Sequence, residues 1–508
     1  MSHSDVRDRY RTYYFGWLVQ QGKKLNGTEQ ESAVRQIEKD LDNILTALNQ
    51  ALEDQRTKNL DQVIRYLGLY FIIQGYHQEG LYQFNQNWQQ LFNAPQSTKR
   101  SLYWAAIYKV RFLSVIGRNA EVQQFWPHCQ ALLADLTAEN EDIRAEQATY
   151  YGEEGYRLYF PEPNKAKKIF QQSFEIHKEL NELWLAGYAL LSKARAARNL
   201  GDLVGAEAAT TAGLEIFQAL NNRKAIGDAQ LLLGYLAGLG GNFSTAEHWL
   251  KKGIASARTL NNIWSLANDG LNKLGMVYYF SGRFKEAMVP NAEYRLLSEE
   301  YGYPWGIIHH ETASGNLHLH SGLYNEALEQ GKQAFSLASE NKADVMMSEA
   351  LILLAQAQMA LGNIETARTH LQESEKQFLA RSVGTAHYVA GRDFYWGLLD
   401  ILTGQPDSAR THLWTELSGS MNRNANLNLA NVLAGIALLK AKEGDIITAI
   451  ELYALAQNHP FIANSRWFAD MVGQHIEQTA GSLAAEDVQA AHERGMKLDL
   501  WETAKRLL

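Results

Sequence analysis

The sequence has very little cysteine and proline, and it has no long apolar segment. Cys129 is the only cysteine among 508 residues, which excludes an internal disulfide framework and indicates a reducing compartment. The scarcity of proline (8) and the supply of glycine (38) suit many helices that are separated by tight turns. No segment resembles a signal peptide, and no apolar run reaches the roughly 18 residues that a membrane span needs. We therefore expect a soluble cytoplasmic protein without a membrane partner.

The sequence also lacks the charge pattern and the motifs of several functional classes. Its 48 basic and 56 acidic residues give a net charge of −8 and are mixed along the chain, which argues against direct binding to nucleic acid. A Gly-x-x-x-x-Gly-Lys-Ser/Thr phosphate loop is absent, and neither a nucleophile elbow nor a Ser-His-Asp spacing is legible. These absences predict a protein that is not an enzyme and needs no cofactor.

A repeated turn of the form Gly-x-(aromatic or aliphatic)-x-x-Ala organises the chain. Its glycines are Gly201, Gly241, Gly282, Gly322, Gly362, Gly404 and Gly444. Successive turns lie 40, 41, 40, 40, 42 and 40 residues apart, and Gly75 and Gly117 continue the series upstream. A fixed period of this length is typical of a helical solenoid.

The residues of one unit explain where its helices stop and how they pack. A Gly after the first helix can adopt the left-handed conformation that ends helices, and Asn can do the same at Leu-Asn steps such as Leu260-Asn261. The Ala of each turn and Leu-Gly pairs such as Leu274-Gly275 let two helices cross closely. No sustained alternation of apolar and polar residues indicates a strand. We predict an all-α fold, a right-handed α-solenoid of about ten helix-turn-helix units.

The ends of the chain depart from this period, so we predict three regions. Residues 5–54 contain two amphipathic helices that we expect to cap the solenoid. Residues 55–460 form the superhelix itself. After His459-Pro460 the periodic pattern ends, and residues 461–508 are expected to form a C-terminal helical cap.

The pattern of one unit resembles the tetratricopeptide repeat. Its residues are Leu274, Gly275, Tyr278, Gly282 and Ala287. The period near 40 differs from the roughly 34 residues of that family, and several units lack the Tyr. The resemblance implies that the first helices of the units line a concave groove.

A narrower resemblance covers most of the chain. Residues 35–53 and 63–84 look like the entry into the helical-repeat region of bacterial STAND-class signal-transduction ATPases of the maltose-operon activator type. Residues 451–460 and 490–508 look like the end of that region. The resemblance implies a sensor arm that binds an inducer or a partner and acts on a nucleotide-binding module. The 508 residues contain no such module. It would be part of the same polypeptide or of another chain.

The groove positions implied by the tetratricopeptide resemblance hold polar and aromatic residues. They are Tyr188, Arg195, Arg198, Asn199, Asp228, Tyr235, Asp269, Asn272, Met276, Tyr279, His309, Asn316 and His320. Equivalent positions also hold Thr312, Glu349, Gln356 and Met359. One interpretation is an ordinary solvated surface. The functional interpretation is that Arg195, Arg198 and Asn199 bind an anionic or carboxylate group, while Tyr235 and Tyr279 bind the rest of an extended ligand.

Four histidines crowd into the segment 309–320, at His309, His310, His318 and His320. Metal binding on a helix favours imidazoles spaced i,i+4 on one face, and these residues do not have that spacing. We therefore predict no metal site there and expect His309 and His320 to serve as hydrogen-bonding groups in the groove.

These patterns favour a non-catalytic sensor or partner-binding region of a signalling or transcription-regulatory protein. Its partner would be a protein or peptide segment, or a small-molecule inducer, in the concave groove. Two alternatives stay open, a constitutive protein-protein scaffold and a peptide-pheromone receptor built on the same repeats.

Overall fold

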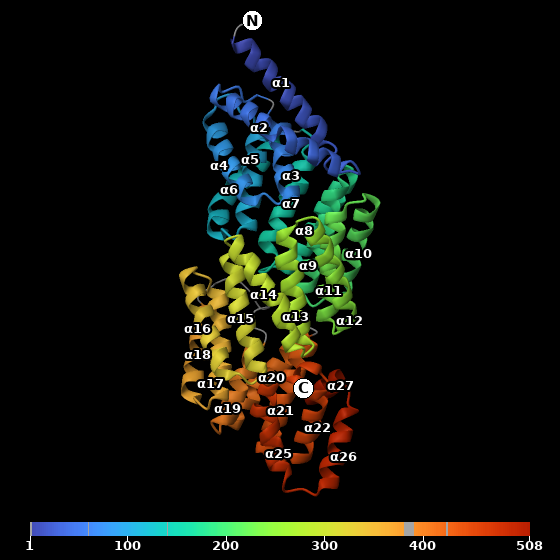
Figure 1. Cartoon of the computed structure of the whole chain (residues 1–508), viewed down its shortest axis with the longest axis vertical. Helices are drawn as coiled ribbons and strands as arrows, with labels where there is room; N and C mark the ends of the chain where they lie inside the picture. Colours follow the sequence, from blue (N-terminus) through green and yellow to red (C-terminus); the bar gives the residue numbers. More distant parts are fainter. Residues whose placement is uncertain (1–2, 59, 140, 380–390, 423–424) are drawn as a thin grey trace. The chain divides into compact units, whose positions relative to one another are not determined.

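The computed structural model describes residues 3–58, 60–139, 141–379, 391–422 and 425–508, and within these residues the chain is helical without strands (Figure 1). The predicted all-α solenoid of tetratricopeptide-like units is confirmed. No helix in these residues combines the length and apolar character that a bilayer crossing requires. The chain divides into two compact units, residues 1–229 (unit 1) and residues 230–508 (unit 2).

Unit 1 consists of helices paired in sequence order. They are α1 (His3–Gly22), α2 (Gln30–Glu53), α3 (Asp61–Gln74), α4 (His77–Asn93), α5 (Lys99–Val115), α6 (Asn119–Ala138), α7 (Arg144–Leu158), α8 (Pro163–Glu179), α9 (Leu183–Asn199), α10 (Leu203–Ala219) and the first part of α11 (Arg223–Leu239). Each of the helices α4 to α9 packs against the next one along the chain.

Unit 2 continues with the rest of α11 and the same alternation. Its helices are α12 (Phe243–Thr259), the π-helix η1 (Ser265–Leu271), α13 (Asn272–Phe280), α14 (Phe284–Glu300), α15 (Pro304–His320), α16 (Tyr324–Glu340), α17 (Asp344–Ala360), α18 (Ile364–Leu379), α19 (Arg392–Leu402), α20 (Pro406–Asn422), α21 (Asn426–Lys442) and α22 (Ile446–Gln457). The chain then forms α23 (Pro460–Asn464), α24 (Arg466–Phe468), the π-helix η2 (Ala469–Gly473), α25 (Gln474–Ala480), α26 (Ala485–Met496) and α27 (Leu500–Leu507).

The turns have the conformation that their residues predict. The repeat glycines have positive φ angles, for example 75° at Gly201 and 87° at Gly444, as left-handed helix ends require. Asn181, Asn221 and Asn261 close the second helices with φ angles of 57°, 52° and 51°. A residue that can adopt this conformation therefore ends the helix at each of these positions, as predicted.

Small residues allow the close helix crossings, although not equally at every site. The turn alanines Ala206, Ala246, Ala287 and Ala327 are at most 1% exposed. A Cβ added to Gly234 would lie 2.9 Å from the Ala246 carbonyl oxygen, which is too close. At Gly275 the nearest atoms would be 3.8 Å away, an ordinary contact. Close packing thus requires Gly at the first position and only a small residue at the second.

The N-terminal helices of unit 1 also contact helices that follow much later in the sequence. Arg65 of α3 forms an ion pair with Glu182, at the start of α9, with both side chains 13% exposed. The Lys224 ammonium group of α11 donates a hydrogen bond to the carbonyl oxygen of Ile73. The N-terminal helices therefore contact several repeats and not only the first one. The predicted boundaries at residues 54 and 460 stay predictions.

In unit 2, residues 459–473 form what we call the C-terminal strap. Phe461 of the strap packs against Tyr279, Phe284 and His320, with ring centroids 5.0, 5.7 and 4.6 Å away. Further along, the Trp467 indole N–H donates to the Gln356 carbonyl oxygen at 3.1 Å. The strap thus packs against residues of α13, α14, α15 and α17. Helices α25 and α26 pack against α22 (Figure 1).

Candidate binding surface

The first helices of the repeats carry the candidate residues, and within each compact unit we call the side of these helices that bears the candidate residues its first-helix face. In unit 1 its members come from α5, α7, α9 and α11. Tyr188 and Asp228 take equivalent positions 40 residues apart, and the Tyr188 hydroxyl donates to the Asp228 carboxylate at 2.6 Å. This contact places the two predicted groove residues side by side on neighbouring first helices.

A cluster of two arginines, a glutamate and a tyrosine lies on this face, and we call it the Arg111 cluster. Arg111 and Glu153 form an ion pair with an N–O distance of 3.5 Å, and the Arg111 guanidinium carbon lies 4.5 Å from the centre of the Tyr156 ring. The Tyr156 and Ser192 hydroxyls are 2.7 Å apart. Arg195 completes the cluster through its charge, which acts on both Tyr156 and Tyr188.

The charges of both arginines act on the Tyr156 hydroxyl. Burial alone would raise the pKa of Tyr156, but the charges of Arg111 and Arg195 and the Ser192 hydroxyl hold its pKa below the ordinary value. Burial also raises the pKa of Glu153, and the charge of Arg111 opposes that effect. The Oε2 atom of Glu153 has no hydrogen-bond partner within the described part of the chain, and the residue is 7% exposed.

Further charged groups lie near this cluster. Burial, followed by the charges of Arg111 and Lys224, lowers the pKa of His77 to about 4, so this imidazole is neutral at pH 7. Burial also lowers the pKa of Lys224, although the charge of Asp228 works in the opposite direction. The neighbourhood therefore combines three basic side chains, Arg111, Arg195 and Lys224, with the acidic groups of Glu153 and Asp228.

Arg198 and Asn199, which the sequence grouped with Arg195, have a different environment. Arg198 donates to the Asn199 side-chain oxygen at 2.9 Å and to the Tyr159 hydroxyl. Asn199 in turn donates to the carbonyl oxygen of Tyr159 at 3.2 Å. These contacts join the end of α9 to the residue after α7, and they occupy donors that the predicted anion site would need.

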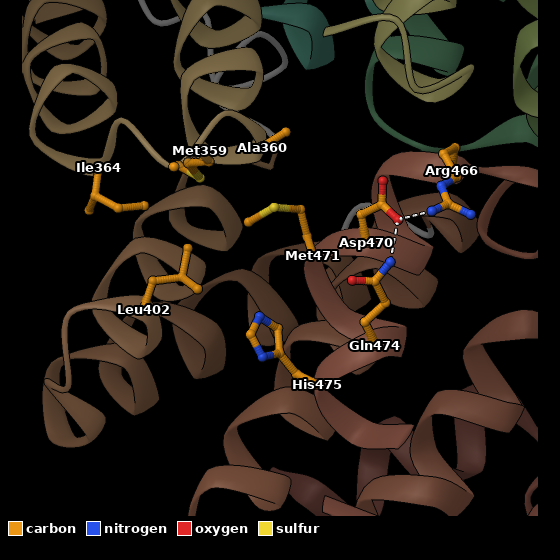
Figure 2. A pocket seen from close by; sticks show the side chains of 10 residues that line it. Met359, Ala360, Ile364, Leu402, Arg466, Asp470, Met471, Gln474 and His475 are labelled. Carbon is orange, nitrogen blue, oxygen red and sulfur yellow. Dashed lines mark hydrogen bonds and ion pairs between the residues drawn. The ribbon is translucent and has the colours of Figure 1, made fainter. Parts of the chain in front are cut away.

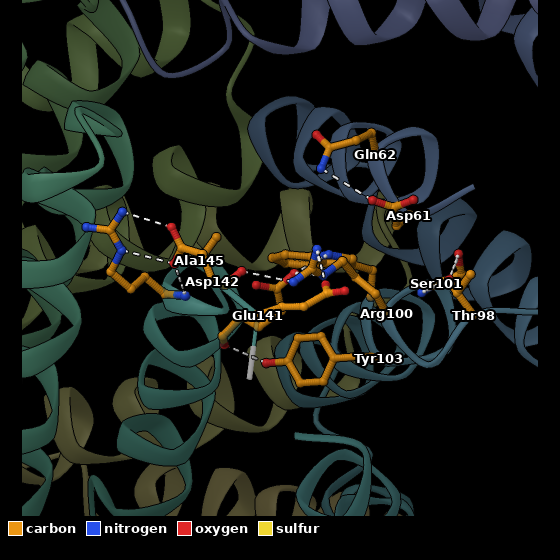
Figure 3. Close-up of polar contacts among 12 residues, drawn as sticks. Asp61, Gln62, Thr98, Arg100, Ser101, Tyr103, Glu141, Asp142 and Ala145 are labelled. Atoms are coloured by element: carbon orange, nitrogen blue, oxygen red, sulfur yellow. Dashed lines mark hydrogen bonds and ion pairs between the residues drawn. The ribbon is translucent and has the colours of Figure 1, made fainter. Parts of the chain in front are cut away.

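A second polar network lies at the beginnings of the first helices of unit 1. Figure 3 shows Arg100 beside Glu141 and Asp142, with its guanidinium donating to the Asp142 carbonyl oxygen at 2.9 Å. Arg100 also pairs with the buried Glu146 at 3.1 Å, and Glu146 accepts the indole N–H of Trp104 at 3.2 Å. Because these groups bond one another between α5 and α7, we assign the network to helix packing.

In unit 2 the first-helix face is built around Lys273, which the sequence did not single out. The Lys273 ammonium nitrogen lies 5.0 Å from the centre of the Tyr235 ring and 3.8 Å from the Met276 sulfur. Burial and the charge of Lys273 together lower the pKa of His309 to about 4. The structure thus brings Tyr235, Met276 and His309 around one ammonium group.

Other predicted residues of unit 2 interact mainly with their neighbours. Asp269 lies within the π-helix η1. The burial of Tyr303 and the charge of Asp269 raise the pKa of Tyr303 to about 12. Asn272 lowers the pKa of the neighbouring Tyr294 hydroxyl, which donates to the Asn268 side-chain oxygen at 3.2 Å. The Asn316 side chain donates to the carbonyl oxygen of Thr312 at 3.0 Å.

The strap covers Tyr279 and His320. His320 is 3% exposed, its Nδ1 lies 2.7 Å from the Ser465 hydroxyl, and burial lowers its pKa to about 3. These two predicted groove residues therefore contact the chain's own strap. Among the described residues, no group of three or more His, Cys, Asp or Glu side chains could hold a metal ion.

A cleft of about 420 Å³ lies beside the strap (Figure 2). It is lined by Met359, Ala360, Gly362, Ile364, Leu402, Arg466, Asp470, Met471, Gln474 and His475. The Asp470 carboxylate accepts hydrogen bonds from Tyr324 at 2.6 Å and from Gln474 at 2.8 Å, and it pairs with Arg466 at 2.8 Å. Since these polar groups bond one another, the Asp470 side of the cleft offers a ligand little specific recognition.

Arg111, Glu153 and Tyr156 are the residues that the sequence reasoning missed. Arg111 and Glu153 lie 84 and 42 residues before Arg195, at equivalent positions of α5 and α7. The groove positions predicted from the sequence begin in α9 and leave out α5 and α7. Counting backwards from Arg195 in steps of 42 would have found both residues.

The comparisons with known proteins agree with this fold. A family model described as tetratricopeptide repeat matches residues 348–373, in α17 and α18. No curated protein matches the sequence. A solved structure of a Rap protein complexed with Competence and Sporulation Factor is 16% identical with a TM-score of 0.50, and the match covers 72% of this chain and 99% of that chain.

Two further solved structures show lower similarity. One is a signal transduction ATPase with numerous domains and a tetratricopeptide repeat sensor from Pyrococcus horikoshii, which is 14% identical with a TM-score of 0.41 and covers 82% of this chain and 55% of that chain. The other is a human IFIT1 dimer with PPP-AAAA, 14% identical with a TM-score of 0.43, over 85% and 95% of the two chains.

The fold therefore defines a class, the all-helical repeat proteins. Within that class, the chain has a tetratricopeptide-like repeat fold.

Proposed function

We propose that the chain is a non-catalytic sensor or partner-binding region of a signalling or transcription-regulatory protein, and that it binds its ligand on the first-helix face. The Arg111 cluster carries this proposal. Arg111 pairs with the buried Glu153 and lies over the Tyr156 ring, and the charge of Arg195 on the next first helix also acts on Tyr156. Charged groups that are fixed in place before binding give a ligand both orientation and affinity.

A peptide is the first ligand class to test. A Rap protein of similar fold is complexed with Competence and Sporulation Factor, and the alternative of a peptide-pheromone receptor extends that kind of binding to this chain. The resemblance of residues 35–53 and 451–460 to STAND regulators favours a sensor that acts on a nucleotide-binding module, in the same chain or in another. In both cases the ligand would bind on the first-helix face.

A binding screen tests the proposal. Because a ligand that binds only the folded state stabilises it, a matching peptide or small molecule should raise the melting temperature of the purified chain. Arg195→Ala should then weaken binding at least about tenfold, since a hydrogen bond to a charged group contributes roughly 1.5–3 kcal/mol. Affinity would be measured by isothermal titration calorimetry, and helicity by circular dichroism.

Arg118→Ala is the matched control, because Arg118 lies in the same unit, is 48% exposed and pairs with Glu121 of the following helix turn. Its affinity should equal that of the unaltered chain. A response to a protein partner alone, with no peptide or small molecule bound, would favour the constitutive scaffold. Equal affinities of the Arg195 variant and the control would remove this face from the binding site.

A further inference from the structure

The cleft of about 420 Å³ beside the strap lies within unit 2 and has the size of a small-molecule site (Figure 2). Ligand pockets have volumes of roughly 300–1,000 Å³ and combine apolar walls with a few polar groups. One wall of this cleft comes from α24, η2 and α25. The other comes from the turn between α17 and α18 and from the end of α19. The chemistry of these two walls decides what the cleft can bind.

The apolar part of the cleft is formed by methionine, isoleucine and leucine side chains. Met359 and Met471 are 2% and 7% exposed, whereas Ile364 and Leu402 are half-buried. Figure 2 shows the Met471 side chain pointing from η2 toward the end of α17, where Met359 lies. Methionine side chains are flexible and polarizable, so they adapt to apolar groups of different shapes. The cleft therefore offers an apolar ligand a surface that can adjust to it.

Three of the four polar side chains of the cleft, Arg466, Asp470 and Gln474, are already bonded to one another. His475 is the exception, because its imidazole makes no hydrogen bond within the residues that the structure describes. Burial, followed by the charge of Lys442, lowers the pKa of His475, so the ring is neutral at pH 7. A neutral imidazole has one N–H donor and one acceptor nitrogen, and it can therefore bond to a hydroxyl or amide group of a ligand.

The backbone of the wall that carries His475 has an unusual conformation. Residues Ala469–Gly473 form η2, which interrupts the α-helical turns between α24 and α25. Such π-helical segments are rare and frequently occur at functional sites. Met471 lies within η2, and His475 follows it by four residues in α25. One helical segment thus supplies both an apolar group and a free hydrogen-bonding group to the cleft.

We propose that the cleft binds a small amphiphile, whose apolar body lies between Met471 and the turn from α17 to α18 and whose neutral head group bonds to His475. A charged head group is disfavoured, because Arg466 and Asp470 already compensate each other's charge at 2.8 Å. The site goes beyond the function proposed above, since that function is carried by the Arg111 cluster of unit 1 and does not need the cleft.

Short-chain alcohols test the site without a known ligand. NMR of methyl-labelled methionine would follow the nine methionines of the full chain at pH 7 during titration with 1-hexanol, sodium hexanoate or hexylammonium chloride. The signals of Met359 and Met471 should move and saturate, most tightly with 1-hexanol. Affinity should rise about fourfold for each methylene added from 1-butanol to 1-hexanol. Met347, which is 8% exposed in a separate apolar cluster, is the internal control and should not respond.

Paired substitutions at His475 isolate the contact with the head group. His475→Gln keeps a hydrogen-bonding side chain and should bind 1-hexanol within about twofold of the unaltered chain, whereas His475→Leu should bind it about three- to tenfold more weakly. On the apolar side, Ile364→Asn should weaken binding at least about fourfold. His492→Leu and Val289→Asn, both at exposed positions outside the cleft, are the matched controls and should change nothing.

The other outcomes overturn the proposal. Joint movement of all methionine signals without saturation would show nonspecific partition of the alcohol. Tighter binding of hexanoate or hexylammonium would exclude a neutral head group, and equal affinities of the two His475 variants would exclude the contact with His475. A leucine-rich peptide that moves the signals of Met359 and Met471 when 1-hexanol does not would make the cleft a protein-docking groove. None of these results changes the test with Arg195→Ala, so failure of the cleft and failure of the proposed function are distinguishable.

Discussion

At the scale of single residues, the glycines of the helix crossings differ in what they tolerate. Gly234→Ala should lower the stability of unit 2 by about 1–3 kcal/mol, because the new Cβ would lie 2.9 Å from the Ala246 carbonyl oxygen and 2.7 Å from Leu250 Cγ. Thermal and urea unfolding would measure the loss.

Gly275→Ala is the matched control, since the nearest atoms to its new Cβ are 3.8 Å away. Alanine also favours a helix over glycine by about 1 kcal/mol, so this variant should equal or exceed the unaltered chain in stability. Equal changes in the free energy of unfolding for Gly234→Ala and Gly275→Ala would contradict this prediction, because they would show that the two crossings are packed alike.

Residues with a local preference could be predicted from the sequence, and residues defined by packing could not. The turn glycines and Asn181, Asn221 and Asn261 were predictable because left-handed backbone is intrinsic to those residue types. Glu153 was not recognised as a partner of Arg111, because the groove positions predicted from the sequence begin in α9 and leave out α5 and α7. The bonds of Arg198 to Tyr159 depend on how two units stack, which no local pattern contains.

At the scale of elements, the strap stabilises unit 2 through buried aromatic rings. Trp467 is 0% exposed, and its indole N–H bonds to the Gln356 carbonyl oxygen. Trp467→Ala should therefore lower the stability of unit 2 by about 3–5 kcal/mol, the usual cost of truncating a buried aromatic side chain. Hydrogen exchange should become faster along the strap and at the ends of α15 and α17.

Trp264→Ala serves as the comparison, because Trp264 is 40% exposed and contacts the Tyr303 ring at 5.1 Å. Trp264→Ala should lower the free energy of unfolding by less than about 1 kcal/mol. If the strap stabilises unit 2, Trp467→Ala should lose clearly more free energy of unfolding in chemical denaturation than Trp264→Ala. Equal losses would contradict this role of the strap.

The contacts that the strap makes could not be predicted from the sequence. The periodic pattern ends at His459-Pro460, which predicted a change of structure at that point. It did not predict that Phe461 would pack on Tyr279 or that Ser465 would bond to His320, 145 residues away. Such pairs depend on the stacking of several units, whereas periodicity reports only on neighbours within one helix.

At the scale of the whole molecule, buried histidines make stability depend on pH. Burial is the main cause that lowers the pKa of His77, His309 and His459 to about 4 and that of His320 to about 3, whereas an unfolded histidine titrates near 6.5. The unfolded chain therefore binds more protons between these values, so the contribution is present above pH 6.5 and is lost as the pH falls toward 4.

Melting temperatures measured from pH 7.5 to pH 5 should accordingly fall by about 5–10 °C or more. Glu349 offsets part of the loss, because burial raises its pKa to about 7 and its contribution has the opposite sign. His320→Gln should flatten the dependence, and His492→Gln, at an exposed position, should leave it unchanged. A profile that is flat over this range would contradict the burial of these imidazoles.

The strap also has a consequence for the order in which unit 2 is completed. Helix pairs such as α15–α16 close through contacts that are near in sequence, so they can form as soon as they leave the ribosome. Trp467 and Ser465 follow their partners Gln356 and His320 by 111 and 145 residues. Until that stretch has been synthesised, Tyr279 and Phe284 have no strap to cover them. A nascent chain passes through an interval in which these aromatic side chains are open to chaperones or to other nascent chains.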